Sequence, residues 1–156
     1  MALLNAAALP ASVQWAVLGA GGLLLVGMLT GVWKYASLMR SPARRAHRYV
    51  DIAHRASLMY SFAALVLAAL AALSVWPDWV NQLAVASNLL FFVGAIGSYV
   101  LHGALQDTTN QLRPPYRLGQ WPLAGVLVHG FMLALVAGEI GGVVVLLSGA
   151  WPVLVG

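Results

Sequence analysis

The sequence predicts an all-α protein, a single domain of residues 1–156 built as an integral membrane bundle of four transmembrane helices. Three observations predict this fold class: the composition, four long apolar runs and the placement of the basic residues. Of the 156 residues, 62% are hydrophobic and only 8% are charged. A soluble domain carries about 25% charged residues. This chain therefore has too little polar surface to cover a water-soluble globule.

The four apolar runs are each long enough to cross about 30 Å of hydrocarbon, which takes roughly 20 helical residues. In lipid, backbone polar groups must be satisfied within the segment, so each run is predicted to be a helix. The predicted spans are about residues 12–36, 54–76, 82–105 and 121–148.

Small residues mark faces where these helices are expected to pack closely, because they let helix backbones approach each other in a membrane. The first span carries Gly19, Gly21, Gly22 and Gly27.

The fourth span is expected to start near Trp121. Pro122 fits the first turn of that helix, where the N–H that proline lacks is not needed.

The basic residues indicate the topology. All eight Lys and Arg residues lie in or beside two connections, the one before the second span and the one after the third. By the positive-inside rule these connections face the cytoplasm, while the WPDWVN turn and both termini face outward. We therefore expect a multi-pass protein of the inner (cytoplasmic) membrane, in contact with the lipid bilayer. The net charge of +4 is then a topology signal, and no nucleic acid is expected as a partner.

The third span carries polar residues on one helix face. A polar side chain inside a span is costly and is a functional candidate by default. Spacings of three or four residues, at about 100° per residue, form a single stripe. The stripe consists of Asn88, Phe92, Ala95, Tyr99, His102 and Gln106. The competing interpretation is a set of interhelical hydrogen bonds without a chemical role.

The fourth span carries His129 and Glu139, ten residues apart and on different faces. Glu139 is expected beyond the membrane midplane, where it must be neutral, hydrogen-bonded or near water. A proton relay and a subunit contact are both open roles for it.

Two histidines, His54 and His102, are expected near the same end of neighbouring antiparallel helices, because the short WPDWVN turn joins those helices. Their ends can therefore converge, although His54 alone could also be an interfacial histidine. Copper is disfavoured because the chain has no cysteine and no methionine cluster, and zinc needs three or four close ligands. Haem b needs only one or two histidines and an apolar cavity, so it is the cofactor that the residue types favour.

The pattern resembles the styrene oxide isomerases: four spans, a histidine after a basic loop at the start of the second, and a tyrosine near the end of the third. The matching stretches are GLLLVGMLTG in the first span, AH at 53–54, GSYVLH at 97–102 and NQ at 110–111. The resemblance covers most of the chain. Tyr60 and Phe91 depart from it, because the family has an asparagine and an aspartate at the matching positions.

The resemblance implies a homotrimer with haem b between neighbouring subunits and His54 as the axial ligand of the haem iron. It implies that ferric haem acts as a Lewis acid on an apolar aryl epoxide such as styrene oxide, which rearranges to an aldehyde by a Meinwald rearrangement. Tyr99 and Tyr60 are the expected catalytic residues, Tyr99 by orienting the substrate. His102 is not expected from the family and is predicted to bind the cofactor through a haem propionate or as a second ligand. The expected substrate pocket consists of Asn88, Phe91, Phe92 and Ala95.

Two other functions stay open. One is a non-enzymatic haem b membrane protein that passes electrons, with His54 paired to His102 or His129. The other is an accessory membrane subunit without a cofactor. One histidine opposite a tyrosine-lined pocket favours the isomerase, whereas two histidines converging at one depth favour electron transfer.

Overall fold

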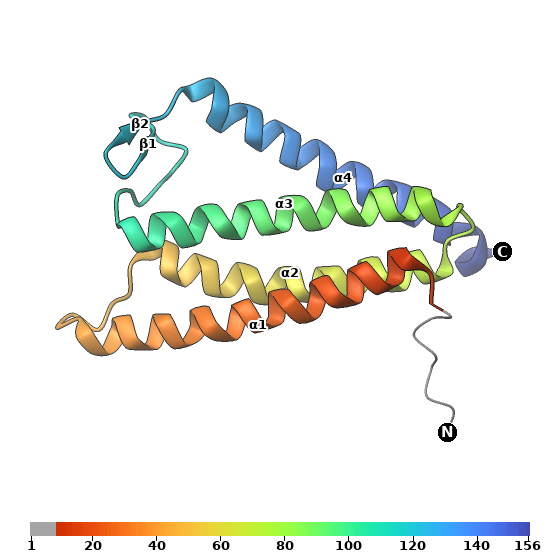
Figure 1. The fold of residues 1–156 in the computed structure, drawn as a ribbon, viewed down its shortest axis with the longest axis horizontal. Coiled ribbons are helices and arrows are strands. Elements are labelled where there is room, and N and C mark those ends of the chain that lie inside the picture. Colours follow the sequence, from red (N-terminus) through yellow and green to blue (C-terminus); the bar gives the residue numbers. More distant parts are fainter. Residues whose placement is uncertain (1–8) are drawn as a thin grey trace.

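The structure, a computed structural model that describes residues 9–156, is a bundle of four long helices (Figure 1). The helices are α1 (Ala11–Arg40), α2 (Arg48–Leu73), α3 (Asp78–Leu105) and α4 (Gly125–Val155). A small antiparallel ribbon of β1 (Arg117–Leu118) and β2 (Trp121–Pro122) lies between α3 and α4. All four helices are long and apolar enough to cross a membrane. The predicted fold class is confirmed, and the chain is a multi-pass membrane protein.

Helix α2 begins at Arg48, earlier than the predicted start at His54. The His47 side chain accepts a hydrogen bond from the Tyr49 N–H at 3.4 Å, and Asp51 lies in the first turn. A side-chain acceptor and a negative charge both stabilise the amino end of a helix. The polar residues before His54 therefore extend the helix instead of forming a loop.

Helix α4 begins at Gly125, later than predicted. Trp121 and Pro122 form β2, in which Trp121 pairs with Leu118. The expectation that Pro122 occupies the first turn of the helix is therefore wrong. The helix instead runs further at its other end, to Val155.

Small residues bring α1, α2 and α3 close together. Alanine is the commonest buried residue type in these three helices, at positions that include Ala16, Ala20, Ala64, Ala71 and Ala84. Gly27 of α1 lies directly against α2, because a Cβ at this position would be 3.2 Å from the Leu58 backbone nitrogen. Such backbone proximity supports van der Waals contact between membrane helices.

Asp78, at the start of α3, holds the amino end of α1. Its carboxylate accepts hydrogen bonds from the Ala11 N–H at 3.2 Å, and from the Ser12 N–H at 3.3 Å and hydroxyl at 2.6 Å. The first N–H groups of a helix have no partner within it. Asp78 thus caps α1 from a distant part of the chain and aligns the two helices at this end.

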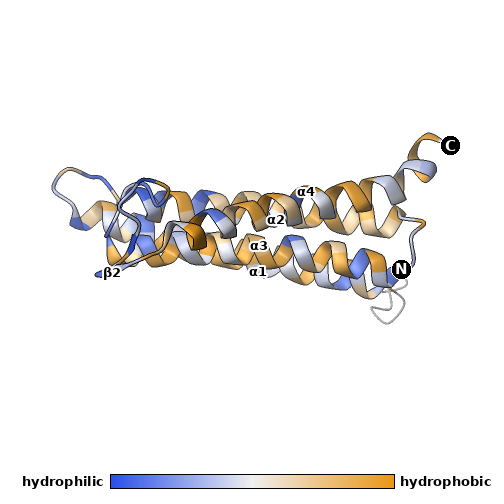
Figure 2. Cartoon of the chain, turned by 90° about the horizontal axis from the view of Figure 1, so that it is seen from above, coloured by the Kyte–Doolittle hydropathy of each residue, from blue (hydrophilic) through white to orange (hydrophobic). Residues whose placement is uncertain are grey.

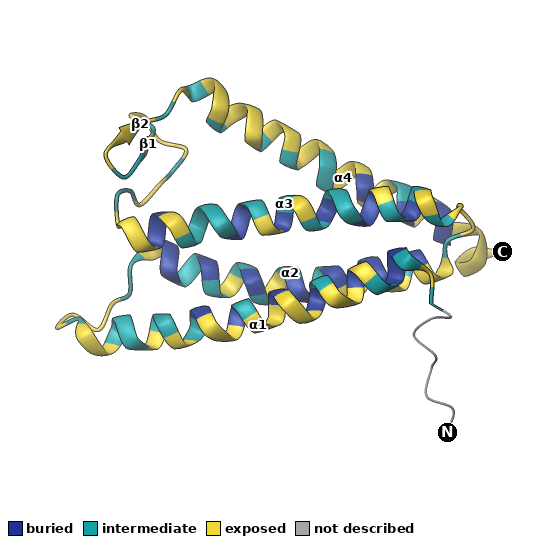
Figure 3. Ribbon diagram, in the orientation of Figure 1, coloured by how far each residue is buried: buried dark blue, intermediate teal, exposed yellow. Residues whose placement is uncertain are grey.

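Helix α4 is attached to the bundle through its carboxyl-terminal half. The Val75 N–H donates to the Gly149 carbonyl at 3.0 Å, and the Trp76 indole donates to the Ser148 hydroxyl at 3.2 Å. The buried residues of α4 are Gly142, Leu146, Gly149 and Ala150. Its amino-terminal half diverges from α3 and is largely exposed (Figures 1 and 3).

The polar residues gather at one end of the bundle (Figure 2). We call this the basic end. It consists of the α1–α2 loop (residues 41–47), the α3–α4 connection (residues 106–124) and the helix turns that adjoin them. All eight Lys and Arg residues lie at or near it, as expected for a membrane protein whose charges are kept at one surface.

Neighbouring glycines on α4 test the close packing of that helix. A Cβ at Gly142 would overlap the Asn88 amide and lie 2.8 Å from the Ala84 carbonyl oxygen, whereas a Cβ at Gly141 would meet nothing within 4 Å. We expect Gly142→Ala to destabilise the fold by about 1–3 kcal/mol through overpacking. Gly141→Ala is expected to be neutral, or stabilising by up to about 1 kcal/mol through helix propensity. Thermal unfolding of the two purified variants in detergent measures the difference, and equal stabilities would contradict the α3–α4 contact.

Candidate functional site

His54 lies on the face of α2 that packs against α1. Its Nδ1 is 2.8 Å from the Gly27 carbonyl oxygen. The ring lies over Gly31, where a Cβ would be 2.9 Å from the His54 Cε1 atom. Gly27 and Gly31 are one helical turn apart, so they provide a shallow groove that admits the imidazole.

The contact with Gly27 determines the tautomer of His54. A carbonyl oxygen only accepts hydrogen bonds, so Nδ1 must carry the proton and donate it. In the neutral imidazole the lone pair then lies on Nε2. In the part of the chain that the structure describes, this nitrogen has no hydrogen-bond partner. A histidine held through one nitrogen, with the other nitrogen free, is the usual arrangement of a metal ligand.

Charged residues adjoin His54 toward the basic end. Asp51, on the same side of α2, pairs with Lys34 of α1 at 2.5 Å and with Arg55 at 3.4 Å. This network links α1 to α2 one turn from the imidazole. It also places two cations beside His54, where an acidic group of a ligand can approach.

Tyr99 is half-buried on α3 and stacks on Tyr49 of α2, with ring centroids 6.0 Å apart and an interplanar angle of 21°. The Tyr49 ring is also 5.3 Å from the ring of His102. The Tyr49 hydroxyl accepts a hydrogen bond from the Gln111 N–H at 2.6 Å. Tyr49 therefore joins the α3 residues to the connection that follows. Sequence reasoning missed it, because it precedes the predicted start of the second span.

Tyr60 stacks on Phe92 with ring centroids 4.2 Å apart and an interplanar angle of 13°. Tyr60 and Tyr99 both interact electrostatically with Glu139 of α4. One carboxyl oxygen of Glu139, Oε1, is buried without a hydrogen-bond partner among the described residues. The two phenols and the carboxyl group come from three helices and lie within electrostatic range of one another.

The predicted stripe on α3 is mostly buried. Asn88, Phe92, Ala95 and His102 are all at most 5% exposed. Asn88 donates to the Ala84 carbonyl at 2.9 Å, and its own Oδ1 has no partner within residues 9–156. Gln106 leaves the stripe, because α3 ends at Leu105 and Gln106 adopts a left-handed conformation with φ of 51°.

The residues expected to line a substrate pocket point in different directions. Phe92 packs on α2 through Tyr60. Phe91 contacts α4 instead, with its ring 6.1 Å from that of Phe131. Asn88 also lies against α4, at Gly142. Within one chain these residues divide between the α2–α3 and α3–α4 contacts, so they do not surround a single enclosed cavity.

His102 is held by an acidic residue of the connection after α3. Its Nδ1 is 2.8 Å from the Asp107 carboxylate, and both side chains are only 6% exposed. The other oxygen of Asp107 accepts from the Gly119 N–H at 2.5 Å. Burial raises the pKa of Asp107, whereas the hydrogen bonds from Gly119 and His102 lower it. The lowering outweighs the effect of burial, so the pKa of Asp107 lies below its ordinary value.

His54 and His102 lie toward the same end of the bundle but face different partners. His54 contacts α1, whereas His102 contacts Asp107 and Tyr49. His129 is apart from both, on the exposed part of α4, where its Nε2 is 2.9 Å from the Tyr116 hydroxyl. No cluster of three or more His, Asp or Glu residues suited to a metal ion occurs in residues 9–156.

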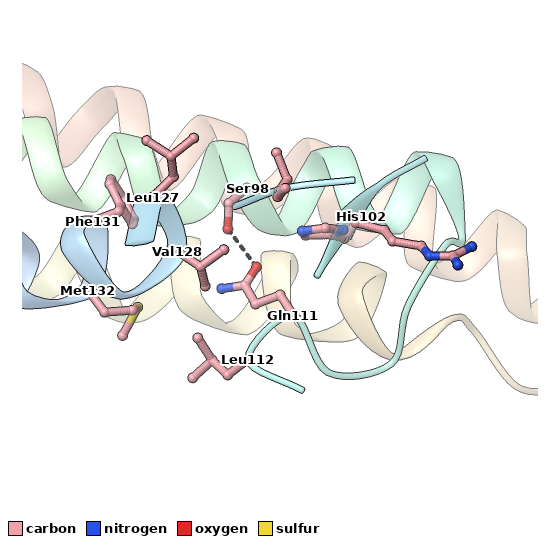
Figure 4. Close-up of a pocket in the computed structure, with 10 residues that line it drawn as sticks. Ser98, His102, Gln111, Leu112, Leu127, Val128, Phe131 and Met132 are labelled. Atoms are coloured by element: carbon pink, nitrogen blue, oxygen red, sulfur yellow. Dashed lines mark hydrogen bonds between the residues drawn. The ribbon is translucent and has the colours of Figure 1, made fainter. Parts of the chain in front are cut away.

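Two adjoining cavities lie at the basic end. A cavity of about 180 Å³ between α3 and α4 is mainly apolar and includes His102, Ser98 and Phe131 in its lining (Figure 4). A second cavity, of about 430 Å³, is lined by polar residues of the α3–α4 connection and by Arg48 of α2. Arg117 lines both.

No family model, curated protein or solved structure matches this chain.

The Asp107 contacts predict a pH dependence of the α3–α4 connection. Because the folded pKa of Asp107 lies below the unfolded value of about 3.9, the stabilisation is present above that pH. It is lost as the pH falls through the folded pKa. At neutral pH, Asp107→Asn should speed hydrogen exchange of the Gly119 amide roughly tenfold, because a charged acceptor is replaced by a neutral one.

Mass-spectrometric hydrogen exchange on peptides containing Gly119 provides the measurement. Asp78→Asn, at the opposite end of the bundle, is the matched control and should leave the exchange at Gly119 unchanged. Unaltered exchange in the Asp107 variant would show that this carboxylate does not hold the connection.

Proposed function

We propose that this protein is a haem b-dependent epoxide isomerase of the cytoplasmic membrane. It converts an apolar aryl epoxide, such as styrene oxide, to an aldehyde. The observation that carries the proposal is the hydrogen bond from His54 Nδ1 to the Gly27 carbonyl, which leaves Nε2 available as an axial ligand. The residue that the resemblance to the styrene oxide isomerases assigns to the iron thus has the tautomer that the role requires.

His54 suits haem, but one chain does not enclose it. Cavities that hold drug-sized ligands measure about 300–1,000 Å³ and are mostly apolar. The larger cavity of about 430 Å³ is polar, and the apolar one is only about 180 Å³. Leu24 and Met28, exposed apolar residues of α1 close to Gly27, provide one wall of the proposed haem site. A second copy of the chain would supply the other, in agreement with the proposed homotrimer.

Burial and cavity size favour His54 over His102 as the ligand. His102 is also held through Nδ1, here by a carboxylate. It is buried under the α3–α4 connection, however, and the apolar cavity that it lines is too small for a porphyrin. Paired ligation by His54 and His102 within one chain receives no support from their contacts.

Ferric haem, when bound, supplies a Lewis acid for the epoxide oxygen. The residues of this chain have the remaining tasks. The Gly27 carbonyl keeps His54 oriented, and Lys34 and Arg55 offer positive charge to the acidic groups of the cofactor. The rearrangement moves a hydride within the substrate, so no external oxidant or reductant is needed.

Tyr99 and Tyr60 are proposed to act on the substrate. A phenol donates a hydrogen bond to an epoxide or aldehyde oxygen, and the half-buried Tyr99 can orient that oxygen. When the C–O bond of the epoxide opens, the substrate becomes a carbocation that water would trap as a diol. Tyr60, stacked on Phe92, contributes an apolar wall that keeps water away from it. Tyr99 lies on α3 and Tyr60 of α2 packs on α3 through Phe92, whereas His54 contacts α1. The proposal therefore places the His54 face of one subunit against the tyrosine face of the next.

The basic end is proposed to face the cytoplasm, because the positive-inside rule applies to its two connections. A site within the membrane suits an epoxide that partitions into lipid. Glu139 has no assigned step in this proposal.

The haem proposal predicts a Soret absorption band in the purified protein. We expect His54→Ala to abolish the band, because the axial ligand is removed. His129→Ala, a matched histidine substitution on the exposed part of α4, should retain it, as should His102→Ala. A wild-type protein without a Soret band after expression with added haem would exclude the proposal, and so would an unchanged band in His54→Ala.

The isomerase proposal predicts phenylacetaldehyde from styrene oxide, measured by gas chromatography. Tyr99→Phe should lower the rate by roughly 10- to 100-fold through loss of orientation. Tyr116→Phe, in the α3–α4 connection where the hydroxyl contacts His129 on the exposed part of α4, is the matched control and should have no effect. Co-expression of His54→Ala with Tyr99→Phe should recover part of the activity, because some interfaces would carry both intact residues. Lack of recovery would contradict a site shared between subunits.

A further inference from the structure

We propose that the two cavities at the basic end together bind one anionic phospholipid, with its phosphate among arginines and an acyl chain between α3 and α4. This inference depends on neither His54 nor haem. It starts from charges that the proposed isomerase does not use.

Three arginines from separate places in the chain line the larger cavity. Arg48 is the first residue of α2, Arg113 lies in the α3–α4 connection, and Arg117 lies in β1. None of the three forms an ion pair within residues 9–156, where the ion pairs are those of Asp51 and Asp107. Three cations around one cavity of about 430 Å³ repel one another unless an anion lies between them.

The one carboxylate in the lining is already engaged. Asp107 accepts from His102 through Oδ1 and from the Gly119 N–H through Oδ2. Asp107 forms no ion pair with an arginine within residues 9–156, and the lining has three arginines for this one carboxylate, so it keeps an excess of positive charge.

The other polar residues of the lining are suited to an anion. The Thr108 hydroxyl accepts from the Asn110 N–H, and the Asn110 side-chain oxygen accepts from the Leu112 N–H, both at 3.0 Å. These bonds use acceptors and leave the Thr108 O–H and the Asn110 amide N–H groups as donors. A phosphate takes hydrogen bonds from donors of this kind as well as from arginine.

The adjoining cavity distinguishes a lipid from a free phosphate. It measures about 180 Å³ and shares Arg117 with the larger cavity. Leu127, Phe131 and Met132 of α4 provide apolar lining, and the Ser98 hydroxyl is occupied by Gln111 at 3.0 Å (Figure 4). Helix α4 diverges from α3 at this end of the bundle (Figure 1), and the proposal has the acyl chain enter the cavity there. An anionic head beside an apolar chain is the chemistry of a phospholipid at the membrane surface.

Native mass spectrometry of delipidated protein in a non-ionic detergent tests the proposal. The probes are phosphatidylglycerol, phosphatidylcholine with the same short chains, and inorganic phosphate. We expect phosphatidylglycerol to bind most tightly. The double variant Arg113→Gln/Arg117→Gln should weaken that binding by roughly 30-fold, which corresponds to the loss of two cation contacts with an anionic lipid.

The matched control is Arg44→Gln/Arg45→Gln, which removes the same charge from the α1–α2 loop, outside both cavities. It should leave phosphatidylglycerol binding within about twofold of the wild type. Phe131→Ala should weaken phosphatidylglycerol binding without changing that of phosphate. Equal losses in the two arginine pairs, or equal affinities for the two lipids, would overturn the proposal in favour of general surface charge. Inorganic phosphate binding as tightly as phosphatidylglycerol would overturn it in favour of a free-anion site.

Discussion

The close approach of α1 to α2 is the constraint on which the rest of the structure depends. Glycine at positions 27 and 31 removes side chains from one stripe of α1, and Leu58 and His54 of α2 fill the space. In a membrane, where lipid is as apolar as leucine, such contact must come from packing and polar bonds between helices. The same contact brings the Gly27 carbonyl oxygen within 2.8 Å of the His54 imidazole. The packing of α1 on α2 therefore also determines the tautomer of His54.

The two ends of the bundle are held by different interactions. At the end away from the basic residues, Asp78 caps α1, and the α2–α3 turn bonds to Gly149 and Ser148 of α4. At the basic end, Asp107 holds the α3–α4 connection by its contacts with His102 and Gly119. Helix α4 is therefore fastened at one end and free to diverge at the other. This divergence leaves room for cavities beside α3 and exposes apolar surface for lipid or another subunit.

The polar groups within the bundle are incompletely paired. Asn88 Oδ1 and Glu139 Oε1 are both buried without partners in the described part of the chain. A buried unpaired acceptor costs about 1–3 kcal/mol, more if it is charged. Asn88 lies on α3 at its contact with Gly142 of α4, and Glu139 lies on α4 about one turn before that glycine. A buried water molecule at this contact would satisfy both acceptors.

The sequence by itself determined the fold class, the four helices and the common end for the basic residues, and it raised the hypothesis that His54 is a ligand. Hydrophobic length, charge placement and residue type are local properties, and they are read along the chain. Only the tertiary structure decided that Gly27 accepts from His54, that Tyr49 stacks on Tyr99, that Asp107 holds His102 and that Pro122 lies in a strand. Each of these depends on which residues meet across helices or in a connection, and that follows from the rotation and register of helices packing in three dimensions. Periodicity along one helix indicates a buried face such as that of Asn88, Phe92 and His102, but it does not indicate what that face contacts.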